Sequence, residues 1–194
     1  MDVREVKRDL RNQIRARILA MPAEVRAREE LALADRLASL PGFREAGTVL
    51  LYASAFPEEF DTAPLLRLAL DSGKRLICPR VVRAEARLAL FEIRRIPGDF
   101  APGTLGIPEP RSDRPEIDVA AVDWVLVPGL GYDDRCYRIG RGAGHYDRLL
   151  TKLRAEVPRW SLCLTSQWVA SLPVEPHDQR LDGVADADRL VTRA

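Results

Sequence analysis

The stretch 48–79, TVLLYASAFPEEFDTAPLLRLALDSGKRLICP, decides the fold class. An apolar run over 48–53 is followed by a polar loop, a periodic apolar segment over 63–71 and a second apolar run, RLICP, at 75–79. Asp61 and Thr62 are of the types that cap helices, and Gly73 suits the position after a helix end. The pattern predicts a strand, a helix and a second strand. Such a unit pairs its strands in parallel.

The flanking segments extend this unit into a larger sheet. Apolar residues at helical spacing predict a helix over 3–18, and Pro22 suits the start of a second helix that runs to about Leu40. RLALFEI at 87–93, DWVLVPG at 123–129 and SLCLT at 161–165 predict further strands, with a helix from about His145 to Glu156. The proline- and glycine-rich segment 96–115 predicts a long loop. We expect one domain over 1–194, a three-layer α/β fold with a mostly parallel sheet and helices on both faces.

Composition limits the classes of partner. The chain has 194 residues, 46% hydrophobic and 30% charged, with a net charge of +1, so it lacks the basic excess typical of proteins that bind nucleic acid or anionic membranes. No apolar run approaches the roughly 20 residues of a membrane span, and the charged N-terminal segment is unlike a signal peptide. A cytoplasmic protein is expected. Cys78, Cys136 and Cys163 form no CxxC pair, which argues against a disulfide framework or zinc site, and Cys78 and Cys163 are expected in the core.

The segment 138–150, RIGRGAGHYDRLL, is the strongest candidate for a binding site. Its alternating glycines allow the backbone to approach a phosphate without interference from Cβ atoms, and Arg138 and Arg141 add positive charge. A helix that begins after the loop would also favour an anion there. The segment matches neither the Walker A motif nor GxGxxG, and a tight turn with solvated arginines is the alternative.

Charged residues elsewhere could complete this site. Asp147 could stabilise the first turn of its helix or hold Mg²⁺ beside a phosphate. Lys7 and Arg11 lie one helical turn apart at the border of an apolar stripe, where they could reach an anion or extend into water.

The loop after the first predicted strand carries a second set of candidates. Asp61 is expected to cap a helix. Glu59 has no evident structural role and could accept hydrogen bonds from a polar heterocycle or remain solvated. The aromatic residues Phe56, Tyr132 and Tyr146 could stack on a ligand or pack in the core. His145 and His177 have no zinc-binding spacing, and the chain has no GxSxG elbow for a serine nucleophile.

Together and in this order, these segments resemble the 5-formyltetrahydrofolate cyclo-ligase family. The resemblance runs over KRDLR, SAFPEEFDT, GKRLICPRV, LGIPEP, DWVLVPGLGYDDRCYRIGRGAGHYDR and LPVEPHD. It implies a ligase that uses ATP and Mg²⁺ to close 5-formyltetrahydrofolate into 5,10-methenyltetrahydrofolate through a phosphorylated formyl group, with release of ADP and phosphate. The fold it implies is that of ribose-5-phosphate isomerase and CoA-transferase-like proteins.

The resemblance also assigns site residues. It places ATP at Lys7, Arg11, Arg138, Ile139, Gly140, Arg141, Gly142, Ala143, Gly144, His145 and Tyr146. It places folate at Ser54, Glu59, Arg141, Gly142, Ala143, Gly144 and His145. Asp147 and Asp178 match metal-associated carboxylates, and Arg138 and Arg141 would stabilise charge during phosphoryl transfer.

The chain departs from the family pattern at a few positions. His145 stands where an aromatic residue is common, Cys136 replaces a frequent glycine, Ile139 replaces leucine, and Ala143 offers no cation. An ATP-independent sugar-phosphate isomerase or CoA-transferase relative, or a folate-binding protein without turnover, are the alternatives. Small-molecule substrates, no nucleic acid or membrane partner, and a monomer are expected.

Overall fold

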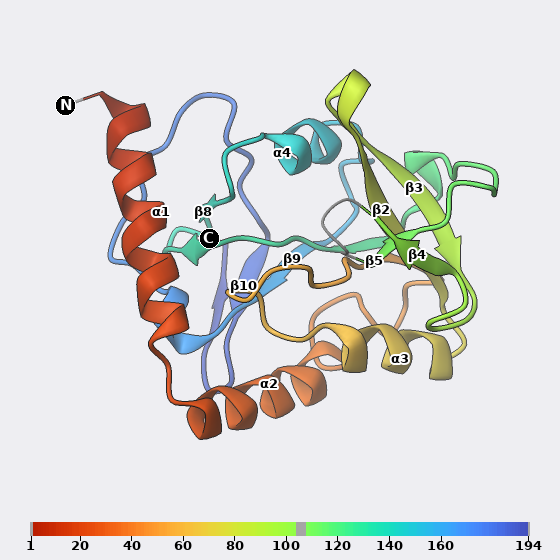
Figure 1. Ribbon diagram of the computed structural model, residues 1–194, viewed down its shortest axis with the longest axis horizontal. Coiled ribbons are helices and arrows are strands. Elements are labelled where there is room, and N and C mark those ends of the chain that lie inside the picture. Colours follow the sequence, from red (N-terminus) through yellow and green to blue (C-terminus); the bar gives the residue numbers. More distant parts are fainter. Residues whose placement is uncertain (1, 104–107, 194) are drawn as a thin grey trace.

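The computed structural model describes residues 2–103 and 108–193, and a seven-stranded sheet forms its centre (Figure 1). The strand order is β11-β10-β9-β6-β1-β2-β3. The bounds are β1 Thr48–Leu50, β2 Arg75–Val82, β3 Arg87–Ile93, β6 Trp124–Leu126, β9 Arg159–Leu162, β10 Gly183–Ala185 and β11 Leu190–Thr192. The four inner pairings are parallel, and only the outer pairs β2–β3 and β10–β11 are antiparallel. The predicted mostly parallel sheet is therefore confirmed.

Helices cover both faces of the sheet, as predicted. The helices α1 (Val3–Leu19), α2 (Ala23–Leu37) and α3 (Ala63–Asp71) bury their apolar stripes in one core cluster, together with Val49 of β1. The next residue, Leu50, points into a second cluster with the end of α4 (His145–Leu150). This alternation follows from the two-residue period of a strand. In Figure 1, α4 lies on the side of the sheet opposite α2 and α3.

Two predicted elements differ from the structure. The helix α4 ends at Leu150 and not near Glu156. Directly after Leu150, the hydroxyl of Thr151 donates a hydrogen bond of 3.0 Å to the carbonyl oxygen of Arg148 and so competes for an acceptor that the helix would use. The predicted long loop contains two short antiparallel strands, β4 (Phe100–Pro102) and β5 (Pro108–Pro110), while residues 104–107 of it lie outside the described part. Proline at the strand ends explains why the composition indicated only a loop.

Smaller shifts affect strand ends. The strand β2 continues past Pro79 to Val82 because it pairs with the whole of β3, and β9 begins at Arg159, before the predicted SLCLT. Two further short strands, β7 (Gly131–Tyr132) and β8 (Arg138–Ile139), pair antiparallel just before the glycine-rich segment.

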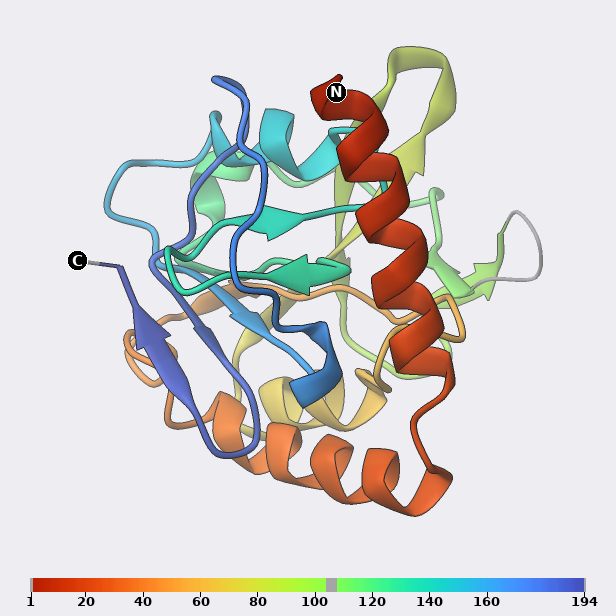
Figure 2. The same ribbon diagram turned by 90° about the vertical axis from the view of Figure 1, so that its left-hand side faces the viewer.

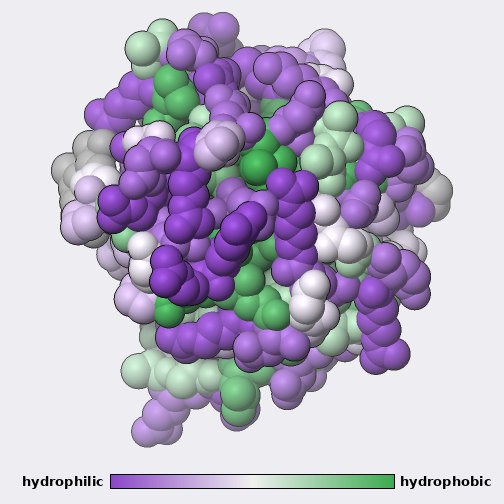
Figure 3. Space-filling model, turned by 90° about the vertical axis from the view of Figure 1, so that its right-hand side faces the viewer, coloured by the Kyte–Doolittle hydropathy of each residue, from purple (hydrophilic) through white to green (hydrophobic). Residues whose placement is uncertain are grey.

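The described surface shows no membrane-spanning element. Within residues 2–103 and 108–193, no helix combines the length and apolar character needed to cross a bilayer. The face in Figure 3 is mostly hydrophilic, with smaller hydrophobic areas between long polar side chains. Cys78 and Cys163 are fully buried, as predicted, and Cys136 is buried too.

Candidate active site

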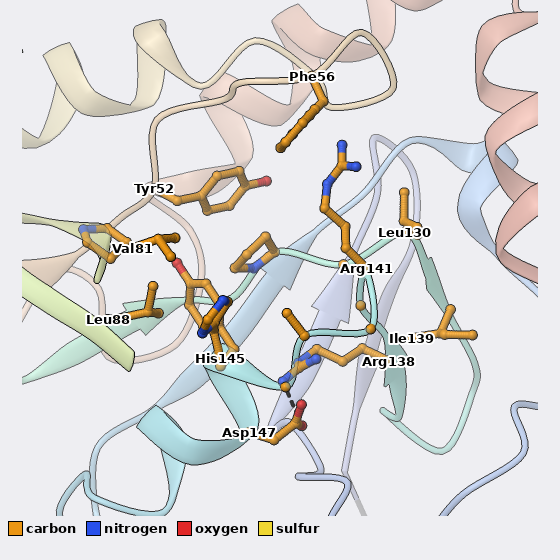
Figure 4. A pocket seen from close by; sticks show the side chains of 18 of the residues that line it. Tyr52, Phe56, Val81, Leu88, Leu130, Arg138, Ile139, Arg141, His145 and Asp147 are labelled. Atoms are coloured by element: carbon orange, nitrogen blue, oxygen red, sulfur yellow. Dashed lines mark hydrogen bonds and ion pairs between the residues drawn. The ribbon is translucent and has the colours of Figure 1, made fainter. Parts of the chain in front are cut away.

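A cavity of about 870 Å³ opens where β1, β2 and β6 end at their carboxyl edges (Figure 4). Tyr52 and Phe56 follow β1, Val81 lies next to the carboxyl end of β2, and Gly129 follows β6; all of them line the cavity. The carboxyl edge of a parallel sheet is where α/β proteins bind ligands. The volume suits a ligand of nucleotide or cofactor size.

The glycine-rich segment forms one wall of this cavity. All residues from Arg138 to Asp147 line it. Gly142 and Gly144 have φ angles of 105° and 65°, a left-handed region that glycine enters without strain, and Gly144 is the N-cap of α4. Just before the wall, Cys136 has a φ of 62°, so it occupies a conformation that glycine would favour. The local sequence therefore turns the backbone itself toward the cavity.

Helix α1 reaches this wall from the other end of the chain. The Nε atom of Arg11 donates 2.8 Å to the carbonyl oxygen of Gly140, across 129 positions of sequence. Figure 2 shows α1 running along the side of the molecule that carries the β7–β8 hairpin. Burial, the largest effect, lowers the pKa of Arg11. The structure thus brings together the two cationic segments that the sequence separated.

Lys7 lies one turn earlier on α1 and is already paired. Its Nζ atom lies 2.6 Å from Oδ2 of Asp178 and 2.8 Å from Oε2 of Glu175, and its side chain is 9% exposed. Burial by itself would lower the pKa of Lys7, but the hydrogen bonds from Asp178 and Glu175 outweigh it and raise the pKa. Lys7 therefore ties α1 to the C-terminal loop at the cavity edge, and Glu175 is a partner that the sequence did not indicate.

Arg138 and Asp147 form a second ion pair inside the wall. The distance from the Nη2 atom of Arg138 to Oδ1 of Asp147 is 2.8 Å, and the Arg138 side chain is 4% exposed. The same oxygen accepts the backbone N–H of Gln179 at 3.3 Å. The buried Nε of Arg138 has no hydrogen-bond partner within the described residues, which leaves it a donor for a ligand.

Arg141 extends to the opposite wall. Its guanidinium lies 3.3 Å from the ring centroid of Phe56 (Figure 4). It is also 2.9 Å from Glu58 and 3.5 Å from Glu59. Glu58 is a second residue that the sequence did not single out. Its buried state depends on tertiary packing, and nothing local distinguishes it from its neighbour Glu59.

The loop after β1 also corrects one expectation. Glu59 does have a structural duty, because its Oε2 atom accepts the backbone N–H of Ala55 at 2.7 Å. Burial raises the pKa of Glu59 despite this bond and the nearby Arg141. Thr62 is the N-cap residue of α3 and makes no side-chain capping hydrogen bond, while Asp61, one residue earlier, accepts the N–H of Ala63 at 2.9 Å.

Ser54 is the one predicted ligand contact that does not line the cavity. Its hydroxyl accepts the N–H of Thr62 at 3.2 Å, and its own N–H donates 2.8 Å to the Thr62 hydroxyl. This reciprocal pair closes the loop, so any contact of Ser54 with folate remains a prediction.

The aromatic candidates separate into core and cavity. Tyr132 is buried in the second core cluster, whereas Phe56 and Tyr146 line the cavity. The hydroxyl of Tyr146 is buried with no hydrogen-bond partner among the described residues, and burial raises its pKa. His145 lies beside them, with Nδ1 3.2 Å from the carbonyl oxygen of Ala86 on the β2–β3 turn. An unpaired buried hydroxyl next to cationic and carboxylate groups is typical of a ligand site.

Comparison with known proteins decides the family. The sequence profile of the 5-formyltetrahydrofolate cyclo-ligase family matches residues 3–186. The chain belongs to the 5-formyltetrahydrofolate cyclo-ligase family. The protein is therefore an enzyme with 5-formyltetrahydrofolate cyclo-ligase activity. The resemblance stated from the sequence is confirmed.

Individual relatives agree. A 5-formyltetrahydrofolate cyclo-ligase from Mycolicibacterium smegmatis is 31% identical over 92% of this chain and 94% of its own. The mouse 5-formyltetrahydrofolate cyclo-ligase is 26% identical over 96% of both chains. The structure of the Aquifex aeolicus 5,10-methenyltetrahydrofolate synthetase superimposes with a TM-score of 0.83 at 28% identity, covering 96% of this chain and 92% of that one.

Proposed function

We propose that this cyclo-ligase uses ATP and Mg²⁺ to convert 5-formyltetrahydrofolate into 5,10-methenyltetrahydrofolate, ADP and phosphate, and that both substrates meet in the 870 Å³ cavity. One observation carries the proposal. The cavity joins a cationic wall built from α1 and the glycine-rich segment to a wall that carries Glu59 and Phe56. A triphosphate suits the first wall, and a polar aromatic heterocycle suits the second.

The phosphates of ATP are assigned to Lys7, Arg11 and the segment 138–146. Arg138 supports this role because it is buried and its Nε–H has no acceptor in the part of the chain that the structure describes. Arg11 supports it through its hydrogen bond to Gly140, which fixes a guanidinium beside the glycines. Charged donors that are held in place before the substrate binds lose little free energy to reorganisation.

The folate is assigned to Glu59, Ser54 and the segment 141–145. Glu59 lines the cavity, and its carboxylate can accept two N–H groups from a pterin ring. Its Oε1 atom faces Arg141, which favours the ionised form against the effect of burial. Phe56 and Tyr146 present ring faces or edges nearby that would contact the heterocycle.

Asp147 and Asp178 would hold the Mg²⁺ that accompanies ATP. No group of three or more His, Cys, Asp or Glu side chains forms a metal cage within residues 2–103 and 108–193. Mg²⁺ bound with a nucleotide commonly takes only one or two carboxylates, with phosphate oxygens and water as its other ligands. Among the described residues, Asp147 accepts its hydrogen bonds through Oδ1 and Asp178 through Oδ2, so the second oxygen of each suits that role. Nε2 of His177 lies 3.8 Å from the second oxygen of Asp178. Bound Mg²⁺ would neutralise charge on the phosphates.

The chemistry follows from positioning. The formyl oxygen attacks the γ-phosphorus of ATP and ADP leaves. N10 then attacks the activated formyl carbon and loses its proton to water, and phosphate departs as the ring closes. Arg138 and Arg141 would stabilise the charge that develops on the transferred phosphoryl group, as phosphoryl transfer requires. No nucleophile of the protein takes part, and the enzyme would act as a monomer in the cytoplasm.

Stoichiometry tests this proposal. Purified protein is incubated with limiting 5-formyltetrahydrofolate and excess ATP and Mg²⁺, and the methenyl product, ADP and phosphate are quantified together. The proposal expects one ADP and one phosphate for each product molecule. Product formed without ADP would contradict it, and so would ATP hydrolysis that continues after the folate is exhausted.

A further inference from the structure

Glu58 is a buried carboxylate that lies just behind the cavity wall. Its side chain is 6% exposed, and its Oε1 atom lies 2.9 Å from Nε of Arg15 on α1 and 2.9 Å from Nη2 of Arg141. Neither Glu58 nor Arg15 lines the cavity. A single carboxylate oxygen therefore joins the first helix to the tip of the glycine-rich segment.

The position of Arg141 depends on this carboxylate. Arg141 touches three residues of one short loop: it stacks on Phe56, lies 3.5 Å from Glu59 and pairs most closely with Glu58. Gly140 and Gly142 flank Arg141, so the backbone at this point resists reorientation only weakly. The side-chain contacts, and the charged pair above all, therefore fix the guanidinium.

The two carboxylates differ in how firmly they hold their charge. Burial would raise the pKa of Glu58, but the hydrogen bond from Arg15 and the charges of Arg141 and Arg15 outweigh it, so the pKa is lowered. The pKa of Glu59 is raised by burial. The pairing with two arginines thus favours the ionised form of Glu58, whereas burial works against the ionised form of Glu59.

We propose that Glu58 is a positioning residue for the folate half of the reaction: it holds the Arg141 guanidinium against Glu59, so that Glu59 meets the pterin as a fixed carboxylate. This inference rests on the proposed function, since it assumes that Glu59 contacts the folate. It assigns Glu58 no contact with either substrate. Its effect on the reaction passes through Arg141.

A purely structural clamp is the rival explanation, because Glu58 also anchors α1 through Arg15. The chain provides a matched control for it. Arg15→Gln removes the anchor to α1 and leaves the Glu58–Arg141 pair, whereas Glu58→Gln keeps the shape of the side chain and removes the charge that holds both arginines. Arg15 lies outside the cavity, so this control leaves the binding groups untouched.

The experiment measures the Kd of 5-formyltetrahydrofolate and of ATP–Mg²⁺ separately by calorimetry, with circular dichroism to check folding. Glu58→Gln should weaken folate binding about three- to tenfold, the equivalent of one ordinary hydrogen bond. The loss for ATP should be smaller, because Lys7, Arg11 and Arg138 are assigned to the phosphates together with Arg141. Arg15→Gln should leave the folate Kd within about twofold, because Arg15 lies outside the cavity and the Glu58–Arg141 pair stays in place. In an Arg141→Gln background, Glu58→Gln should add no further loss.

Three results would overturn the inference. They are an unchanged folate Kd in Glu58→Gln, an equal loss in Arg15→Gln, and a full additional loss in the Arg141→Gln background. Failure of the proposed function is separate from these, since it would appear in the unmodified protein as an absence of folate binding or conversion.

Discussion

Replacing Lys7 by methionine should destabilise the fold by about 2 kcal/mol. The change keeps most of the aliphatic side chain, which is 91% covered, and removes the ammonium group that lies 2.6 Å from Asp178 and 2.8 Å from Glu175. A hydrogen bond between charged groups contributes about 1.5–3 kcal/mol. The variant offsets part of this loss, because folding no longer has to remove an ammonium group from water. The carboxylate of Asp178 is 16% exposed and regains some hydration, which places the expected loss near the middle of that range.

Urea unfolding followed by circular dichroism at neutral pH measures this loss. Arg8→Met is the matched control, because Arg8 lies on the same helix, its ion pairs with Glu5 and Asp9 are exposed, and its side chain is 65% exposed. We expect less than about 0.5 kcal/mol for the control. A Lys7→Met loss no larger than the control would refute the argument that the buried pair holds α1 to the C-terminal loop.

The pH dependence of this difference has a definite sign. The pKa of Lys7 is raised above its ordinary value of 10.5, so its contribution is complete below that pH and disappears as the pH rises through the folded-state value. The hydrogen bond from Lys7 lowers the pKa of Glu175 below 4.5, so the contribution of that carboxylate is present above pH 4.5 and is lost as the pH falls through the lower value. The gap between the unmodified protein and Lys7→Met should therefore be constant across the neutral range and close at both ends.

Three further predictions concern the cavity and its rim. Glu59→Gln should raise the KM for folate about 10-fold or more while changing the KM for ATP little, since a charged hydrogen bond is lost. Because burial raises the pKa of Glu59, the folate KM of the unmodified enzyme should rise as the pH falls toward that pKa. This rise should be absent in the variant. Asp147→Asn should cost about 2–4 kcal/mol in urea unfolding, because it leaves the buried guanidinium of Arg138 without its counter-charge; a Mg²⁺ titration that is unchanged in this variant would argue against Asp147 as a metal ligand. Ala86→Gly should stabilise the protein by about 0.5–1 kcal/mol, since Ala86 is exposed with a φ of 49°; a loss of stability on thermal unfolding would contradict this.

The fold could be predicted to the extent that its signals are local. The alternation around Leu50, the capping residues before α3 and the apolar runs of the inner strands each depend on a few neighbouring residues, and the structure agrees with them. The strands β4 and β5 were missed because their proline-rich segments gain partners only from tertiary pairing. The end of α4 was missed because a single hydroxyl contact decides it.

The candidate site divides in the same way. The glycine-rich segment carries its conformation in its own sequence, and Lys7 and Arg11 could be placed at the border of a helix face. The partners of Lys7 lie 168 and 171 residues away, and no local pattern indicates them. Glu58 and Glu59 are adjacent and of the same type, yet only the packed loop makes one a buried bridge and the other a cavity residue.

The most direct test of the account is the absorbance of 5,10-methenyltetrahydrofolate as it forms from 5-formyltetrahydrofolate. With purified protein, ATP and Mg²⁺ together, the signal should grow in proportion to the amount of enzyme. It should stop when ATP is omitted or EDTA is added, and return when excess Mg²⁺ is restored. Conversion that proceeds unchanged without ATP, or in the presence of EDTA, would contradict the proposed phosphoryl-transfer mechanism.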